Sequence, residues 1–101
     1  MVKEIKDEDY KKIVKENKKV VIDCYASWCG PCKMLSPILD EISNELDNIL
    51  FCKIDVDNAE NITNDFEIMS IPTILIFEDG TLKNKIVGLR SKSELIDTIN
   101  N

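Results

Sequence analysis

The sequence predicts an α/β domain in which a central five-stranded mixed β-sheet is flanked by four α-helices. Apolar runs suited to strands alternate with apolar stripes of helical spacing along the 101 residues. Two runs, within residues 19–26 and 49–56, are almost continuously apolar, as in strands that are covered on both faces. Near the C-terminal end, Asp79 and Gly80 form a hairpin turn signal between two further runs.

The N-terminal elements are a short strand, a helix and a longer strand. Residues 2–5 predict the first strand, and Asp7 is predicted to cap the helix that follows. The apolar stripe of that helix consists of Tyr10, Ile13 and Val14. Residues 19–26 predict the second strand, in which the acidic Asp23 is unexpected. These elements form the first βαβ unit.

A long helix follows the segment Trp28-Cys29-Gly30-Pro31-Cys32. Its apolar side chains recur at helical spacing, at Leu35, Ile38, Leu39, Ile42 and Leu46. Pro31 suits the first helical turn, where a missing N–H breaks no hydrogen bond. Pro37 lies inside the helix and predicts a kink, because it removes one backbone donor and crowds the preceding turn.

The remaining elements are a strand, a short helix, a hairpin and a final helix. Residues 49–56 predict the third strand, and the hairpin strands cover 73–77 and 82–87. The short helix is indicated by Ala59, Ile62 and Phe66. Ser91 and Glu94 form a capping box that opens the last helix. We therefore expect three parallel strands, with the hairpin as an antiparallel edge.

Charge and hydropathy exclude several classes of partner. The formal net charge of −6 argues against a nucleic-acid or anionic-membrane surface, both of which need clustered Lys and Arg. No stretch approaches the ~20 apolar residues of a membrane span. Residues 1–12 are charged throughout, unlike a signal peptide. We expect residues 1–101 to form a single cytoplasmic domain, monomeric and without membrane or nucleic-acid partners.

The chain has four cysteines and no histidine. In the reducing cytosol, cysteines are expected as thiols, catalytic groups or metal ligands rather than as structural disulfides. The lack of histidine excludes Cys-His and Ser-His-Asp catalysis, and every zinc site that needs imidazole. Thiol chemistry and an all-cysteine metal site therefore stay open.

Cys29 and Cys32 form a C-x-x-C motif between an apolar strand and a helix. Zinc sites also use this spacing, but the strand-to-helix setting is typical of redox motifs. A thiolate at a helix N-terminus is stabilised by unpaired N–H groups and the helix dipole. Cys29 is therefore predicted as the exposed nucleophile. Cys32, one turn into the helix, is predicted to resolve the mixed disulfide, while Gly30 admits a substrate chain and Pro31 adds rigidity.

The segment Ala26-Ser27-Trp28-Cys29-Gly30-Pro31-Cys32-Lys33 resembles the active-site signature of thioredoxins. The resemblance covers essentially the whole chain, with further matches at Asp23, Pro37, Lys53, Ile71-Pro72-Thr73 and Val87-Gly88. It implies the thioredoxin fold and a protein-disulfide reductase with a redox disulfide between Cys29 and Cys32. Such a protein maintains cytoplasmic redox homeostasis by dithiol–disulfide exchange.

The resemblance also implies roles for individual residues. Asp23 would be buried behind the cysteines and accept a proton from Cys32, since burial raises the pKa of a carboxyl group. Lys53 would pair with Asp23 and temper that rise. The implied substrate-binding residues are Trp28, Gly30, Pro31, Ile71, a cis Pro72 and Gly88. The ordinary alternatives are a hydrogen-bonded structural Asp23, a surface Lys53, a trans Pro72 and a core Trp28.

Three positions depart from the family pattern. Tyr25 stands where many members have tryptophan. Cys24 and Cys52 are unusual, and side-chain alternation points them away from Asp23 and Lys53. We predict that both are buried free thiols acting as small hydrophobic residues. A disulfide between them would need a favourable diagonal distance.

Three other functions stay open at this point. The scaffold also suits an oxidase or isomerase, which the reduction potential of the Cys29–Cys32 pair would distinguish. A non-enzymatic binding module is the second alternative. A zinc site of all four cysteines is the third, although the long gap between Cys32 and Cys52 suits no common ligand spacing.

The expected electron source lies outside the chain. No cofactor-binding motif is present, so we expect no bound cofactor and electrons that arrive by thiol exchange. The resemblance implies a flavin- and NADPH-dependent thioredoxin reductase as donor and disulfide-containing proteins as targets. A ferredoxin-linked donor stays open.

Overall fold

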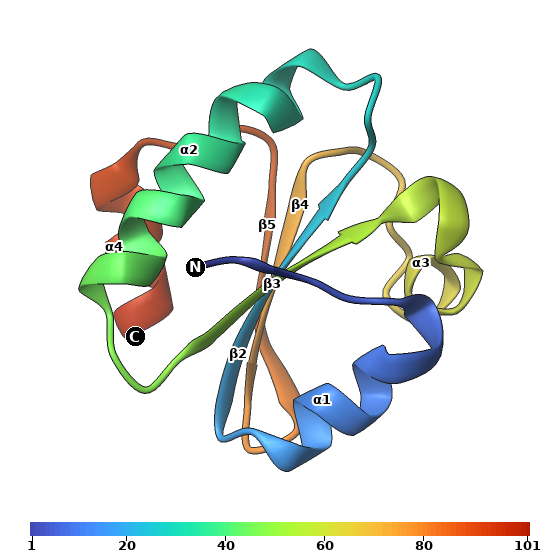
Figure 1. Ribbon diagram of the computed structural model, residues 1–101, viewed down its shortest axis with the longest axis horizontal. Helices are drawn as coiled ribbons and strands as arrows, with labels where there is room; N and C mark the ends of the chain where they lie inside the picture. The colour runs from blue at the N-terminus through green and yellow to red at the C-terminus, as the bar shows by residue number, and fades with distance from the viewer.

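A five-stranded sheet in the order β1-β3-β2-β4-β5 forms the centre of the computed structural model, which describes residues 1–101 (Figure 1). The strands are Lys3–Glu4 (β1), Lys19–Tyr25 (β2), Leu50–Asp55 (β3), Thr73–Glu78 (β4) and Thr81–Val87 (β5). β1, β3 and β2 run parallel, β4 is antiparallel to β2, and β5 is antiparallel to β4. The predicted mixed sheet with an antiparallel hairpin is confirmed.

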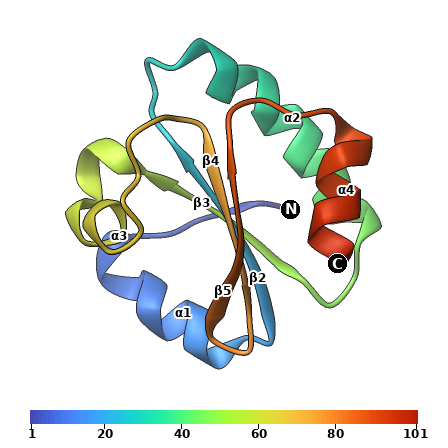
Figure 2. The same ribbon diagram turned by 180° about the vertical axis from the view of Figure 1, so that it is seen from behind.

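Four helices cover the two faces of the sheet. They are Tyr10–Glu16 (α1), Gly30–Glu45 (α2), Glu60–Asp65 (α3) and Lys92–Asn100 (α4). Figures 1 and 2 show α2 and α4 on one face, and α1 and α3 on the other. Short 3₁₀ turns at Asp7–Asp9 and Val56–Asn58 precede α1 and α3. The predicted order of strands and helices is confirmed.

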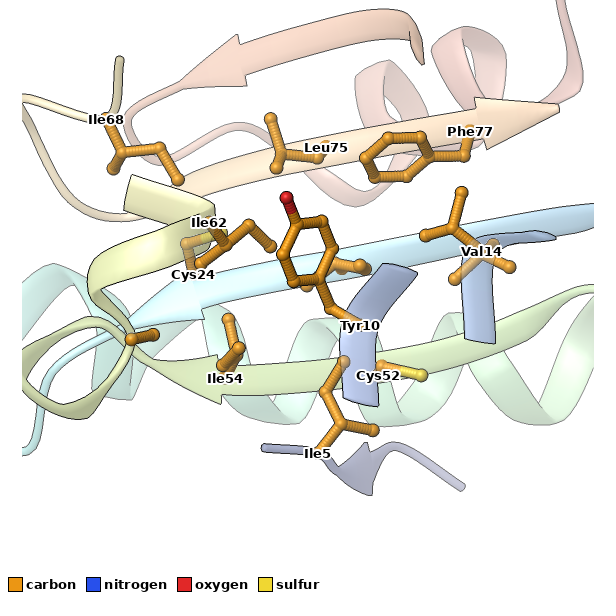
Figure 3. Close-up of a cluster of buried hydrophobic side chains, with 13 residues drawn as sticks. Ile5, Tyr10, Val14, Cys24, Cys52, Ile54, Ile62, Ile68, Leu75 and Phe77 are labelled. Atoms are coloured by element: carbon orange, nitrogen blue, oxygen red, sulfur yellow. The ribbon is translucent and has the colours of Figure 1, made fainter. Parts of the chain in front are cut away.

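Each face of the sheet carries its own hydrophobic core. Strand β2 contributes to both cores because successive side chains point to opposite faces. Val20, Ile22 and Cys24 pack in the cluster beneath α1 and α3 (Figure 3), whereas Val21 packs in the cluster beneath α2 and α4. This two-sided burial explains the continuous apolar run in the sequence. Full burial of each aliphatic side chain contributes about 1.5–3 kcal/mol to folding.

Two local signals act as the sequence predicts. Asp79 and Gly80 form the two-residue connection between β4 and β5, and both have positive φ angles, of 52° and 81°. Such angles match the twist of a two-residue hairpin, and glycine adopts them without steric cost. The capping box of Ser91 and Glu94 is present in both of its parts at the start of α4.

The predicted role of Asp7 is wrong. Asp7 does not cap α1, whose N-cap position is held by Asp9 without a side-chain hydrogen bond. Its carboxylate instead accepts hydrogen bonds from the backbone N–H groups of Asn61 and Ile62, both at 2.9 Å. These donors belong to the first turn of α3, which has no capping side chain of its own. A residue distant in sequence therefore caps α3.

Candidate active site

The C-x-x-C motif lies where the chain passes from β2 into α2. Cys29 is the N-cap residue of α2, and its Sγ accepts a hydrogen bond from the backbone N–H of Cys32 at 3.2 Å. The two cysteines form a disulfide, with their Cα atoms 5.3 Å apart. Pro31 occupies the first turn, and Pro37 lies inside the helix, as the sequence predicts. The sulfur of Cys29 therefore faces the N-terminal end of a 16-residue helix.

The prediction that Cys29 is exposed is wrong for the disulfide form. Cys29 is 4% exposed and Cys32 is 3% exposed, so accessibility does not distinguish them. The pair forms a small apolar cluster with Ala26, against which Tyr25 and Ile71 pack. The two sulfurs instead differ in position, because Cys29 stands at the helix end and Cys32 lies within the first turn.

Asp23 is a buried carboxyl group beside the disulfide. It is 3% exposed, and its Oδ1 atom has no hydrogen-bond partner. It lines a pocket of about 280 Å³ together with Cys32 and Lys53. Burial is the largest influence on this group and raises its pKa to about 7, while the charge of Lys53 lowers the pKa and that of Glu4 raises it. The carboxyl group is therefore suited to exchange a proton near neutral pH.

Lys53 is the neighbour of Asp23 in the sheet but makes no ion pair with it. The two residues are in register on the parallel strands β3 and β2. No salt bridge or hydrogen bond joins them; the Lys53 Nζ atom lies 5.8 Å from the centre of the Tyr25 ring. The influence of Lys53 on Asp23 is electrostatic and acts without direct contact.

Among the implied substrate residues, Ile71 packs directly against the cysteine cluster, and the others differ in exposure. The Trp28 side chain is 69% exposed, and its Nε1–H donates to an Asp57 carboxylate oxygen at 2.8 Å. The Ile71–Pro72 bond is cis, and the Gly88 N–H donates to the Pro72 carbonyl at 2.8 Å. Pro72 itself is buried, whereas Ile71 is half-buried against the cysteines. Trp28 is thus an exposed wall rather than part of the core.

Glycine stands at positions 30 and 88 for different structural reasons. A Cβ atom on Gly30 would meet no other atom within 4 Å, so the space above the motif is open. Gly88 has a φ angle of 91°, a conformation that side chains other than glycine rarely adopt. Gly30 is therefore set by the space around it, whereas Gly88 is set by its backbone conformation.

Sequence reasoning missed Asp57 and Glu4, which bind the aromatic residues of the site. Asp57 accepts from Trp28, and Glu4 accepts from the Tyr25 hydroxyl at 2.7 Å. Glu4 ends β1, and Asp57 closely follows the end of β3. The carboxyl ends of parallel strands meet at one edge of a sheet. The location of Glu4 and Asp57 at such strand ends could therefore have indicated that they lie near the site.

Cys24 and Cys52 are buried free thiols, as predicted. Both lie in the core beneath α1 and α3 (Figure 3), on the opposite side of the sheet from α2. Burial raises the pKa of both thiols, that of Cys52 to about 11. The four cysteines therefore do not converge on one site, and no group of three or more His, Cys, Asp and Glu side chains is placed to hold a metal ion.

Sequence comparison identifies the family to which the chain belongs. A family model described as thioredoxin matches residues 1–101. The chain belongs to the thioredoxin family. A thioredoxin of Rickettsia felis is 44% identical over 102 aligned residues, which cover 99% of this chain and 97% of the relative. A thioredoxin of Mycoplasmoides gallisepticum is 47% identical over 83 residues, which cover 82% and 83% of the two chains.

Solved structures of thioredoxins have the same fold. The oxidised mitochondrial thioredoxin 3 of Saccharomyces cerevisiae superposes with a TM-score of 0.90 at 34% identity, covering 98% of this chain and 93% of that chain. A mutant thioredoxin of Halobacterium salinarum also gives 0.90, at 29% identity over 97% of this chain and 87% of that one. The five-stranded thioredoxin fold is therefore confirmed.

Family membership and the bonded cysteine pair together define the activity class. The chain is a thiol–disulfide oxidoreductase of the protein-disulfide reductase type. Thioredoxins need no prosthetic group for this exchange, and the family implies disulfide-containing targets and a reductase partner. None of the helices has the length and apolar character needed to cross a membrane.

Proposed function

We propose that this protein reduces disulfides of cytoplasmic proteins with unequal roles for its two active-site cysteines. Cys29 is the nucleophile, Cys32 resolves the intermediate, and Asp23 accepts the proton of Cys32. The observation that carries this proposal is the asymmetry of the pair. Cys29 is the helix N-cap and accepts the Cys32 N–H, whereas Cys32 lines the pocket that contains the unpaired Asp23 carboxyl group.

The reaction proceeds in two exchanges. The Cys29 thiolate attacks one sulfur of the target disulfide, forms a mixed disulfide and releases the other target sulfur as a thiolate. The Cys32 thiol then gives its proton to the Asp23 carboxylate, and its sulfur attacks the Sγ atom of Cys29. The second target sulfur leaves, and the Cys29–Cys32 disulfide remains. Two electrons pass from the protein to the target, which becomes a dithiol.

The helix end and the buried carboxyl group serve different steps. The N-terminal end of α2 stabilises negative charge on Cys29, both as attacking thiolate and as leaving group. The pKa of Asp23, about 7, leaves a substantial carboxylate fraction at neutral pH while keeping that carboxylate basic enough to take a proton. Lys53 limits the rise of this pKa and so keeps Asp23 in its working range.

The proposed target surface consists of five exposed or half-buried residues near the disulfide together with the buried Pro72. Its members are Trp28, Gly30, Pro31, Ile71, Pro72 and Gly88. The hydrogen bond from Trp28 to Asp57 holds the indole ring at the edge of this surface. The open space at Gly30 leaves room for an extended target segment to approach the motif.

The dithiol form is regenerated from outside the chain. We expect a flavin- and NADPH-dependent thioredoxin reductase to reduce the Cys29–Cys32 disulfide by thiol exchange. The protein acts in the cytoplasm as a monomer. Turnover of NADPH by a purified reductase of this type, in the presence of this protein and a disulfide substrate, tests the donor; a ferredoxin-linked reductase is the comparison.

The cysteine roles predict distinct phenotypes for two serine variants. Cys29→Ser is expected to abolish insulin reduction, because no nucleophile remains to open the target disulfide. Cys32→Ser is expected to accumulate mixed disulfides at Cys29, because the resolving thiol is missing. Insulin turbidity and mass spectrometry of trapped complexes measure the two effects. Insulin reduction that survives in Cys29→Ser would refute the mechanism.

A further inference from the structure

Three charged side chains form a row across the parallel strands. Glu4 on β1 is in register with Lys53 on β3, and Lys53 is in register with Asp23 on β2. Residues in register lie on the same face of a sheet, so Lys53 stands between two carboxyl groups. It forms no salt bridge with either of them. Its ammonium group instead lies over an aromatic ring.

Tyr25 provides that contact. It lies two residues after Asp23 on β2 and so projects from the same face. The Lys53 Nζ atom is 5.8 Å from the centre of the Tyr25 ring, within the range of a cation–π interaction. The Tyr25 hydroxyl donates to the Glu4 Oε1 atom at 2.7 Å, which ties the ring to the edge strand β1, on the far side of β3. The aromatic ring therefore extends from β2 to β1 next to Lys53.

We propose that Tyr25, tethered by Glu4, is a positioning residue that holds the Lys53 ammonium over its ring and keeps it from pairing with Asp23. This inference rests on the proposed role of Asp23 as proton acceptor. An ion pair with Lys53 would occupy the carboxylate and weaken it as a base. The arrangement leaves the Asp23 Oδ1 atom unpaired in the pocket that Cys32 also lines.

The other groups around Asp23 do not provide an equivalent contact. From α2, Cys32 and Lys33 line the same pocket. From β4, the register partner of Asp23 is the apolar Ile74. On β3, Asp55 is in register with Tyr25, and its charge raises the pKa of the tyrosine hydroxyl. Burial and the bond to Glu4 raise the pKa of that hydroxyl, so Tyr25 stays a hydrogen-bond donor throughout the neutral range.

The test is the titration of the Asp23 carboxyl carbon, followed by ¹³C NMR in the oxidised protein. Tyr25→Leu removes the ring, so Lys53 reaches Asp23 and the carboxyl pKa is expected to fall by about one pH unit. Tyr25→Phe keeps the ring but loses the tether, and a smaller fall is expected. An unchanged titration in Tyr25→Leu would overturn the proposal. A Tyr25→Phe titration identical to that of the wild type would contradict the role of Glu4.

A double variant separates positioning from simple solvent access. If Tyr25 acts through Lys53, Tyr25→Leu should cause no further fall in a Lys53→Met background. A fall of equal size in both backgrounds would show that removal of the ring merely hydrates Asp23, and the proposal would be wrong. Tyr10→Phe is the matched control, because it breaks the hydrogen bond of Tyr10 to Asp65 on the other face of the sheet. It should leave the Asp23 titration unchanged.

The same samples distinguish this inference from the proposed function. The NMR titration uses the oxidised protein and requires no disulfide exchange, so it reports the geometry alone. Insulin reduction by the wild-type protein reports the function. If the Asp23 pKa falls in the Tyr25 variants as expected but the wild-type protein does not reduce insulin, only the proposed function is contradicted. If the wild-type protein reduces insulin but the Asp23 titration is unchanged in Tyr25→Leu, only the positioning role is contradicted.

Discussion

At the scale of single residues, Asp23 combines the proposed role of proton acceptor with a cost in stability. Its carboxyl group is buried in the sheet, and its Oδ1 atom lacks a hydrogen-bond partner. Ionisation of such a group is unfavourable in the folded state compared with the unfolded chain. The burial that raises the pKa of Asp23 to about 7 therefore also weakens the fold when the group is charged.

This cost predicts how stability depends on pH. An unfolded aspartate has a pKa of about 3.9, whereas Asp23 in the fold has a pKa of about 7. The folded state binds the proton more tightly, so the destabilisation is absent below about pH 4, grows as the pH rises to 7, and then stays constant. Asp23→Asn should gain about 2–3 kcal/mol relative to wild type between pH 5 and pH 8. Urea unfolding of the oxidised proteins measures this gain.

Effects of the substitution on stability that do not depend on pH cancel when the values at pH 5 and pH 8 are compared. Asp40→Asn is the control, because Asp40 is an exposed carboxyl group on α2. Its stability relative to wild type should hardly change over the same pH range. If the difference in unfolding free energy between Asp23→Asn and wild type did not change with pH, Asp23 would titrate in the fold as it does in the unfolded chain.

At the scale of elements, the short helix α3 depends on a cap supplied from elsewhere. It has only six residues and no side-chain cap of its own. The Asp7 carboxylate accepts hydrogen bonds from two backbone N–H groups of its first turn, those of Asn61 and Ile62. Helices of this length are not stable alone, so α3 relies on this contact and on packing of Ile62 in the core.

Removal of the cap predicts local weakening of α3. Asp7→Ala is expected to lower the free energy of unfolding by about 1–2 kcal/mol, because two amide donors lose their acceptor. The amide hydrogens of Asn61 and Ile62 should also exchange faster with solvent. Urea unfolding and hydrogen exchange measure the two effects. Glu8→Ala, a change at an exposed neighbour, is the control, and equal exchange rates in the two variants would contradict the capping role.

Local patterns predicted the elements, but not the partners of their side chains. The alternation of residues 23 and 24 placed Asp23 and Cys24 on opposite faces, and the capping box of Ser91 acts within its own helix. The acceptors of Tyr25, Trp28 and the first turn of α3 are Glu4, Asp57 and Asp7. Those contacts depend on the strand order β1-β3-β2, which periodicity along the chain does not determine.

At the scale of the whole molecule, the two faces of the sheet have separate tasks. The face beneath α2 carries Asp23 and the active-site helix, whereas the face beneath α1 and α3 carries the larger of the two cores. Cys24 and Cys52 belong to that larger core and are 0% and 1% exposed. Their thiols are thus shielded from the disulfide exchange that occurs at the edge of the molecule.

This separation predicts the reactivity of the two additional thiols. In the oxidised protein, alkylation of Cys24 and Cys52 should occur only through global unfolding, because both lie in the central core. Labelling with iodoacetamide across a urea series should therefore follow the loss of secondary structure. Rapid labelling without urea, or a Cys24–Cys52 link found by mass spectrometry of alkylated, unreduced protein, would contradict this prediction.

The disulfide closes a loop between residues only three positions apart in the sequence. A disulfide lowers the entropy of the unfolded chain by an amount that grows with the logarithm of the number of residues in the closed loop. For so short a loop, this stabilisation of the fold is only about 2 kcal/mol. Most of the fold therefore does not depend on whether the bond is made or broken. The oxidised and reduced forms therefore share one fold. One molecule can pass through many cycles of oxidation and reduction without refolding.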